Sequence, residues 1–178
     1  MNLIGKKIII RDFQKKDFPE FFELVQDKTN HDLAGLEYTA DESFAHNLLE
    51  MYQRRDGAFV IAQKETDQMV GIIEMNKRGE SGDLLLTREV GFVINRKFRN
   101  QGFAKESVQL LIEYEFNELN LTEIWASSEK DNQAPQKLLE LLGFKYIYEV
   151  NQALPYAMQS NLVKYYLLKK WFTSCKKF

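Results

Sequence analysis

One short stretch of this chain constrains its fold more than any other, because three different local patterns follow one another within it. Residues Glu89–Ile94 are mostly β-branched or aromatic, which is typical of a buried strand. A basic and polar turn follows at Asn95–Gln101. From Gly102 onward the apolar residues recur at helical spacing, namely Ala104, Val108, Leu111 and Ile112. The sequence therefore predicts a buried strand, a tight basic turn and a helix that opens at Gly102.

This arrangement predicts an anion-binding site at the start of the helix. The first N–H groups of a helix have no partner within it, and the helix dipole adds partial positive charge at the same end. Gly102 lets the backbone approach a ligand closely, while Arg96, Lys97 and Arg99 add formal charge. Neither GxxxxGK followed by Ser or Thr nor GxGxxG occurs, which excludes the P-loop and the dinucleotide-binding fingerprint. Taken by itself, the loop is alternatively a solvated basic turn.

Two motifs, in this order along the chain, resemble those of the GNAT acetyltransferases. Arg99-x-x-Gly102-x-Ala104 is similar to the family's Q/R-x-x-G-x-G/A signature, whose loop amides hold the pyrophosphate of acetyl-CoA. About thirty residues later, Asn132–Phe144 resembles the family's N-x-x-(A/S)-x-x-x-x-E-x-x-G-F segment, and it follows an apolar run at Leu121–Ala126. The resemblance extends over about residues 3 to 170 and is closest to the branch that acetylates ribosomal-protein N-termini.

The resemblance implies a cofactor, acetyl-CoA, and a set of residues that hold it. This expected cofactor-binding set is Val93, Ile94, Arg99, Asn100, Gln101, Gly102, Phe103, Ala104, Lys105 and Asn132. Asn132 is alternatively the N-cap of the next helix. The chain departs from the family pattern at Leu139, where many members have a catalytic tyrosine, and at Pro135, where the branch often has serine. The first departure leaves the general acid open, and the second removes a hydroxyl contact to the cofactor.

The remaining patterns predict further elements in the order that the GNAT fold has. Apolar runs predict strands at 7–12, 58–63, 69–75, 121–127, 145–150 and 162–172, and helical spacing predicts helices at 18–27, 42–54, 103–117 and 133–142. We expect one domain over residues 1–178, with its core at about 3–172. The fold class is α/β of the mixed α+β kind. The resemblance implies a mostly antiparallel sheet of six to seven strands, a parallel pair at the fourth and fifth strands, and helices on both faces.

Three local patterns add expectations about the ends of these elements. Lys28–Tyr38 lacks periodicity and is expected to be a loop. Leu84–Ile94 is expected to be one long strand. Asp17–Glu20 and Thr39–Glu42 each match a capping box, in which the first side chain caps the helix that follows.

Glu89 is the candidate general base, because an amine must be neutral when it attacks a thioester. It stands two residues before Gly91, in a Glu-x-Gly pattern similar to that of the ribosomal branch. The alternative is a surface carboxylate at a strand entrance, paired with Arg88. Ser127 and Ser128, at the end of a predicted strand, are candidate proton donors to the leaving thiolate.

The acceptor is expected to be a primary amine, either a protein N-terminal α-amine or the amine of a small molecule. An α-amine with a pKa of ~7.7–8.0 needs only a modest base, whereas a lysine side chain at ~10.4 is almost wholly protonated at neutral pH. The candidate substrate-binding residues lie in two predicted loops and are His31, Glu37, Tyr38 and Tyr156. For Glu37, a solvated loop charge is the alternative.

Composition argues against several other classes of protein. A net charge of −2 gives no global electrostatic case for a nucleic-acid or membrane partner. A single cysteine cannot form an internal disulfide, and two histidines without i, i+4 spacing predict no metal site. We see no signal-peptide pattern and no apolar segment of membrane-spanning length, so the expected location is the cytoplasm, where acetyl-CoA is available.

Two alternatives of a different class stay open at this point. The first is a catalytically silent acyl-CoA-binding module with a regulatory or interaction role, which the departures at Pro135 and Leu139 favour. The second is a phosphate or nucleotide binder, which fits the basic loop but not the segment Asn132–Phe144. The sequence is compatible with a monomer or a homodimer.

Overall fold

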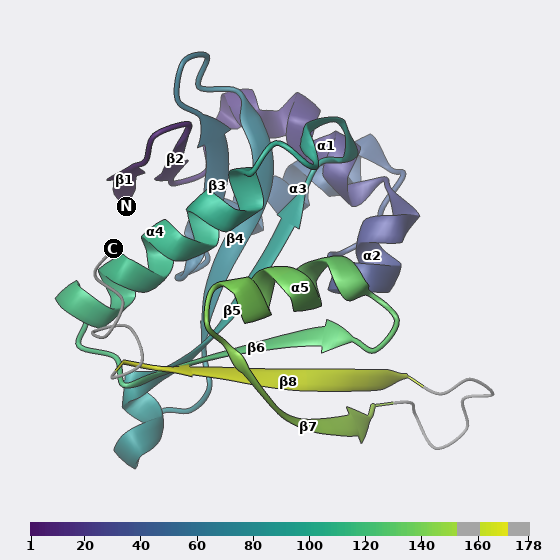
Figure 1. Ribbon diagram of the computed structural model, residues 1–178. Helices are drawn as coiled ribbons and strands as arrows, with labels where there is room; N and C mark the ends of the chain where they lie inside the picture. The colour runs from purple at the N-terminus through teal and green to yellow at the C-terminus, as the bar shows by residue number, and fades with distance from the viewer. Residues whose placement is uncertain (153–160, 171–178) are drawn as a thin grey trace. The chain divides into compact units, whose positions relative to one another are not determined.

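The computed structural model describes residues 1–152 and 161–170 of the chain. Its helices are α1 Phe18–Val25, α2 Lys28–Ala34, α3 Glu42–Arg54, α4 Phe103–Glu118 and α5 Gln133–Leu141 (Figure 1). Its strands are β1 Asn2–Ile4, β2 Ile8–Arg11, β3 Ala58–Gln63, β4 Met69–Lys77, β5 Thr87–Ile94, β6 Glu123–Glu129, β7 Lys145–Asn151 and β8 Leu162–Lys169.

The strands form an eight-stranded sheet in the order β1-β2-β3-β4-β5-β6-β8-β7. β5 and β6 run parallel, with Glu89 opposite Trp125, whereas β1–β4 and β6-β8-β7 pair antiparallel. The expected α/β fold class and its parallel pair are therefore confirmed. The sheet has one strand more than the upper expectation, because β1 has only three residues, two of them exposed, and such a segment carries no hydrophobic pattern.

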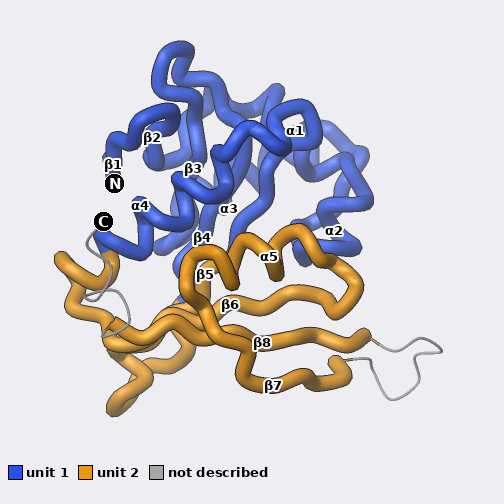
Figure 2. The backbone as a smooth tube through the Cα atoms, viewed as in Figure 1, with its two compact units in different colours: residues 1–76, 91–114 blue, residues 77–90, 115–178 orange. Residues whose placement is uncertain are grey.

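The chain divides into two compact units, which Figure 2 distinguishes by colour. The first unit comprises residues 1–76 and 91–114, and the second comprises residues 77–90 and 115–178. The expectation of one domain over the whole chain stays a prediction.

The core of the first unit lies on both faces of its strands. On one face, Leu48 and Tyr52 of α3 pack with Val60 and Ala62 of β3, in a cluster that also includes α1. Ile61 points to the opposite face, since successive side chains of a strand alternate, and it is just as buried. Helix α4 crosses the near side of β3 and β4 in Figure 1. The expectation of helices on both faces is met in this unit.

The loop predicted at Lys28–Tyr38 is wrong, because its first part is the helix α2. The Asp27 carboxylate accepts a hydrogen bond from the Thr29 N–H at 2.9 Å and caps this helix, and Gly35 ends it with a φ of 67°. A glycine adopts this left-handed conformation without strain. Helix α2 is short and mostly exposed, so it needs no apolar face and leaves no periodic signal.

The long strand predicted at Leu84–Ile94 is also wrong in its first part. Residues Gly82–Leu86 form a 3₁₀ helix, and β5 begins only at Thr87. The side chains of Leu84, Leu85 and Leu86 are 40–51% exposed, so an apolar run stands here on the surface. At the other end of the chain, β8 stops at Lys169, and residues 171 and 172 of that predicted strand lie outside the described residues.

Neither predicted capping box forms as expected. Asp17 precedes α1, but its side chain does not cap the helix, because both of its oxygens bind the guanidinium of Arg11 at 2.7 and 2.8 Å. In the second case the cap is Asp41 rather than Thr39, and its carboxylate accepts from the Phe44 N–H at 2.8 Å. In the first case a buried ion pair takes the place of the predicted cap, and in the second the cap lies two residues further along the chain.

In the second unit, β6, β8 and β7 form an antiparallel set, and α5 contributes Leu139 to the core. The Gly143 that follows α5 has a φ of 94° and donates its N–H to the Glu140 carbonyl, which confirms the expected helix end. Within the described residues, no helix is both long enough and apolar enough to cross a membrane.

Candidate active site

The turn between β5 and α4 has the backbone geometry that an anion site requires. Asn100 and Gly102 both adopt left-handed conformations, with φ of 61° and 86°. A Cβ atom built on Gly102 meets no atom of the described residues within 4 Å, so the space beside this residue is open. The first N–H groups of α4 have no partner within the helix and lie next to this space. Open space at a helix N-terminus is an arrangement that favours the binding of a phosphate group.

The basic side chains of the turn are partly committed to the protein itself. Arg99 donates to the Ile94 carbonyl at 3.0 Å and to the Asn30 side-chain oxygen at 2.9 Å. Lys97 pairs with Glu23 at 2.6 Å. Arg99 thus ties the turn to the end of β5 and to α2, which gives it a structural role that the motif alone did not predict.

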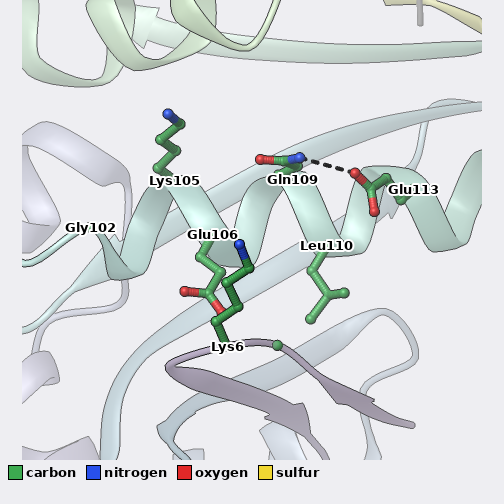
Figure 3. Close-up of a pocket in the computed structure, with 8 residues that line it drawn as sticks. Lys6, Gly102, Lys105, Glu106, Gln109, Leu110 and Glu113 are labelled. Carbon is green, nitrogen blue, oxygen red and sulfur yellow. Dashed lines mark hydrogen bonds between the residues drawn. The ribbon is translucent and has the colours of Figure 1, made fainter. Parts of the chain in front are cut away.

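A groove of about 340 Å³ runs along the first turns of α4, beside the β1–β2 turn (Figure 3). Gly102 and Lys105 of the predicted cofactor-binding set line it, together with Lys6. The β1–β2 turn is fixed to α4, because the Lys7 N–H donates to the Glu106 carboxylate at 2.9 Å. Lysine side chains from two distant segments therefore stand beside the N-terminus of α4.

The other members of the predicted cofactor-binding set lie along the same stretch, apart from Asn132. Val93, Ile94 and Phe103 are buried, whereas Asn100 and Gln101 are exposed at the turn. Ala104 is half-buried in the first turn of α4. Asn132, in the second unit, takes the N-cap position of α5, but its side chain makes no capping hydrogen bond.

The two predicted catalytic residues are in direct contact in the second unit. Ser127 Oγ donates to Glu89 Oε1 at 2.8 Å, and the other carboxylate oxygen accepts from Arg78 Nη1, also at 2.8 Å. The expected alternative partner, Arg88, instead donates to the Leu85 and Thr87 carbonyls. Ser128 is buried, and its hydroxyl bonds the carbonyls of Glu129 and Asn132, which commits it to the loop.

Aromatic side chains lie near the ion pair of Arg78 and Glu89. The Arg78 guanidinium that binds Glu89 also lies 4.6 Å from the centre of the Trp125 ring, a cation–π contact. Tyr148 stacks on Tyr165 with ring centres 4.9 Å apart. Burial, followed by the Glu89 carboxylate, raises the pKa of Tyr165, so this phenol stays protonated at neutral pH and can donate.

Of the predicted substrate-binding residues, Glu37 lies in a pocket of the first unit. This pocket, the Glu37–Glu74 pocket, has a volume of about 120 Å³ and is lined by Ala34, Gly35, Leu36, Glu37, Tyr52, Arg55, Ile72, Glu74, Gly91, Phe92 and Val93. Tyr52 OH donates to Glu37 Oε2 at 2.7 Å. Burial, followed by the carboxylates of Glu74 and Glu37, raises the pKa of Tyr52, so its phenol is neutral throughout the physiological range.

His31 and Tyr38, two other predicted substrate-binding residues, do not line this pocket. His31 Nδ1 lies 2.8 Å from the Leu36 carbonyl oxygen, a contact that holds the end of α2. Tyr38 is 47% exposed, and its ring centre lies 6.4 Å from that of His31. Tyr156 lies outside the described residues.

Sequence reasoning missed three residues of these two sites: Arg78, Tyr52 and Glu74. Tyr52 and Glu74 stand inside amphipathic or apolar runs that predict only core packing, and Arg78 stands in a polar connection. Their partners come from other segments, so no spacing within the sequence marks them. Among the described residues, no group of three His, Cys, Asp or Glu side chains is placed to hold a metal ion.

Comparison with known proteins shows to which protein family the chain belongs. The family model of the GNAT acetyltransferase domain matches residues 7–145. The chain belongs to the GNAT acetyltransferase family. A curated relative, the uncharacterised N-acetyltransferase YnaD of Bacillus subtilis, is 26% identical over 151 residues, which are 82% of this chain and 83% of that protein. The expectation of an acetyl-CoA-dependent GNAT acetyltransferase is thereby confirmed.

Solved structures of GNAT proteins share the fold along almost the whole chain. A GNAT acetyltransferase from Bacillus anthracis is 22% identical with a TM-score of 0.82, over 95% of this chain and 98% of that one. A spermidine N-acetyltransferase from Vibrio cholerae, in complex with CoA and spermine, has a TM-score of 0.77 at 16% identity, over 94% and 98% of the two chains. RimL, a ribosomal-protein α-N-acetyltransferase in complex with coenzyme A, also has a TM-score of 0.77. It is 15% identical, over 95% of this chain and 98% of that one. These likenesses show the fold.

Proposed function

We propose that this GNAT protein transfers the acetyl group of acetyl-CoA to a primary amine by direct attack in a ternary complex. The acceptor is a protein N-terminal α-amine or the amine of a small molecule. Both kinds of acceptor are represented among the structural neighbours, in RimL and in the spermidine acetyltransferase. The observation that carries the proposal is the turn at Gly102, where open space adjoins the N-terminus of α4.

Acetyl-CoA, when bound, supplies the thioester whose acetyl group is transferred. In the proposal, the backbone N–H groups at Gly102 and Phe103 hold its phosphates, and Lys105 adds positive charge. As the new N–C bond forms, the C–S bond of the thioester breaks and CoA leaves as its thiolate, while Glu89 takes the proton that the amine nitrogen loses. Ser127, hydrogen-bonded to Glu89, orients this carboxylate.

Calorimetric titration of acetyl-CoA into the wild type and into Gly102→Glu tests the cofactor site. We expect the wild type to bind and the variant to bind at least ~10-fold more weakly, because a carboxylate and its chain then stand where a phosphate should lie.

Gly82→Glu is the matched control. Gly82 has a φ of 57°, and a Cβ atom built on it, as on Gly102, meets none of the described atoms within 4 Å. The same substitution therefore introduces the same backbone strain and the same charge elsewhere. We expect this control to bind like the wild type. A folded wild type that fails to bind acetyl-CoA, or equal losses in both variants, would contradict the proposed site.

A further inference from the structure

We propose that the acceptor carries a second cationic group besides the amine that is acetylated, and that this group binds in the Glu37–Glu74 pocket. The inference rests on the proposed function, since it names the class of acceptor that the enzyme takes. The cationic group is an ammonium on a short aliphatic chain, as found in a diamine and in a lysine side chain.

The carboxylate of Glu74 has capacity to accept a hydrogen bond from a ligand. Its Oε1 atom is buried and has no hydrogen-bond partner among the described residues. Arg55 Nη1 lies 3.0 Å from this oxygen and forms an ion pair, but not in the direction of a hydrogen bond. The other oxygen accepts from Asn76 Nδ2 at 3.3 Å. A buried carboxylate oxygen without a donor is unfavourable, so an N–H donor that enters the pocket gains energy here.

The charges that line the pocket favour a cation over an anion. Two carboxylates, Glu37 and Glu74, stand against one guanidinium, that of Arg55. The Arg55 side chain is 40% exposed and also donates to the Asn76 side-chain oxygen at 3.2 Å, so solvent and a second partner weaken its neutralising effect. Burial is the largest cause of the raised pKa of Tyr52, and the carboxylates of Glu74 and Glu37 raise it further, whereas Arg55 lowers it.

The shape of the pocket selects a slender group. Among the described atoms, a Cβ atom built on Gly91 approaches only Glu74 Oε2, at 3.9 Å, so the strand leaves open space facing the carboxylate. Leu36 and Val93 supply apolar walls. The volume of about 120 Å³ compares with about 30 Å³ per water molecule, so it accommodates roughly four non-hydrogen atoms. An ammonium on a chain of three carbons, four non-hydrogen atoms in all, fits this volume. Glu37 is exposed, so the pocket is reachable from solvent.

Two acceptors of equal length test the inference. 1,4-Diaminobutane carries a second ammonium, whereas 4-amino-1-butanol carries a hydroxyl in its place. We expect the wild type to acetylate the diamine with a kcat/KM at least ~10-fold higher than the amino alcohol, measured by thiol release, which corresponds to one well-formed charged contact. Two short peptides, with lysine or glutamine as second residue, are compared in the same assay. A preference for the lysine peptide indicates a peptide acceptor, and a preference confined to the diamine indicates a small-molecule acceptor.

Substitution of the carboxylates assigns the preference to the pocket. In Glu74→Gln and in Glu37→Gln, we expect the ratio between diamine and amino alcohol to fall below about threefold, whatever happens to the absolute rates. Gly91→Val, which fills the space, should lower the ratio in the same way. The matched control is Glu50→Gln on α3, whose carboxylate pairs with Arg54 on the surface and should leave the ratio unchanged.

The outcomes separate this inference from the proposed function. Turnover of both amines at equal kcat/KM, with no peptide preference, would overturn the second cation while leaving the acetyltransferase intact. Binding of acetyl-CoA without turnover of any amine would overturn the proposed function. In that case, calorimetry with 1,4-diaminobutane still decides the pocket: binding that Glu74→Gln removes supports it, and no binding by the wild type refutes it.

Discussion

Replacing Glu89 by glutamine should lower kcat by about 100-fold or more at neutral pH, while acetyl-CoA binds as it does to the wild type. Glutamine keeps the size of the side chain and an oxygen that accepts from Ser127, but it cannot take a proton from the attacking amine. The effect should therefore fall on turnover rather than on cofactor affinity. Thiol release with a saturating amine measures the first quantity, and calorimetry measures the second.

The control for this variant is Glu149→Gln in the same unit. Glu149 pairs with Lys130 at 3.1 Å, and its side chain is 24% exposed, against 28% for Glu89. The two substitutions therefore remove the same charge from similar ion pairs. We expect Glu149→Gln to keep wild-type turnover. If Glu89→Gln keeps more than half of the wild-type rate at every pH between 6 and 9, the assignment of Glu89 as general base is wrong, since a modest base is needed throughout this range.

The parts of the fold that the sequence predicted are those in which one local pattern suffices. The β5–turn–α4 segment combines a mostly buried strand with a helix whose apolar residues recur at helical spacing, and both patterns arise within about thirty residues. Helix α2 and strand β1 escaped prediction because they are short and mostly exposed, so they bury too little apolar surface to leave a pattern. The prediction that the strand begins at Leu84 was wrong for the opposite reason, since Leu84–Leu86 are apolar but exposed.

In the candidate site, too, some residues could be predicted from local sequence patterns and others could not. Glu89 and Ser127 were both selected from the sequence, and the parallel register that places Glu89 opposite Trp125 brings Ser127 onto the same face, two residues further on. Arg78 reaches Glu89 from the β4–β5 connection, and nothing in its own neighbourhood predicts that contact. Glu74 gains its significance from the open space at Gly91, which only the folded chain reveals.

The largest expected effect on stability comes from the buried ion pair of Arg11 and Asp17. Their residues are only 7% and 2% exposed. The Arg11 guanidinium uses all five of its N–H groups, two of them on Asp17 and the others on the Asp12 carbonyl and on the carboxylate and carbonyl of Asp67. We expect Arg11→Met to lower the free energy of unfolding by about 3–5 kcal/mol, because it leaves the Asp17 carboxylate buried without its counter-charge.

Chemical denaturation of single and double variants separates the pair from its parts. Asp17→Asn alone should also lower the free energy of unfolding, since it removes the negative charge that Arg11 faces. The Gln14 N–H, which donates to an Asp17 oxygen at 2.8 Å, can still donate to the amide oxygen of the asparagine. The double variant should lose less than the sum of the two single losses, because neither partner is then left as an unpaired buried charge. Glu50→Gln, in a surface pair whose side chains are 83% and 62% exposed, should change stability by less than about 0.5 kcal/mol. Strictly additive losses at Arg11 and Asp17 would mean that packing, rather than the ion pair, accounts for the effect.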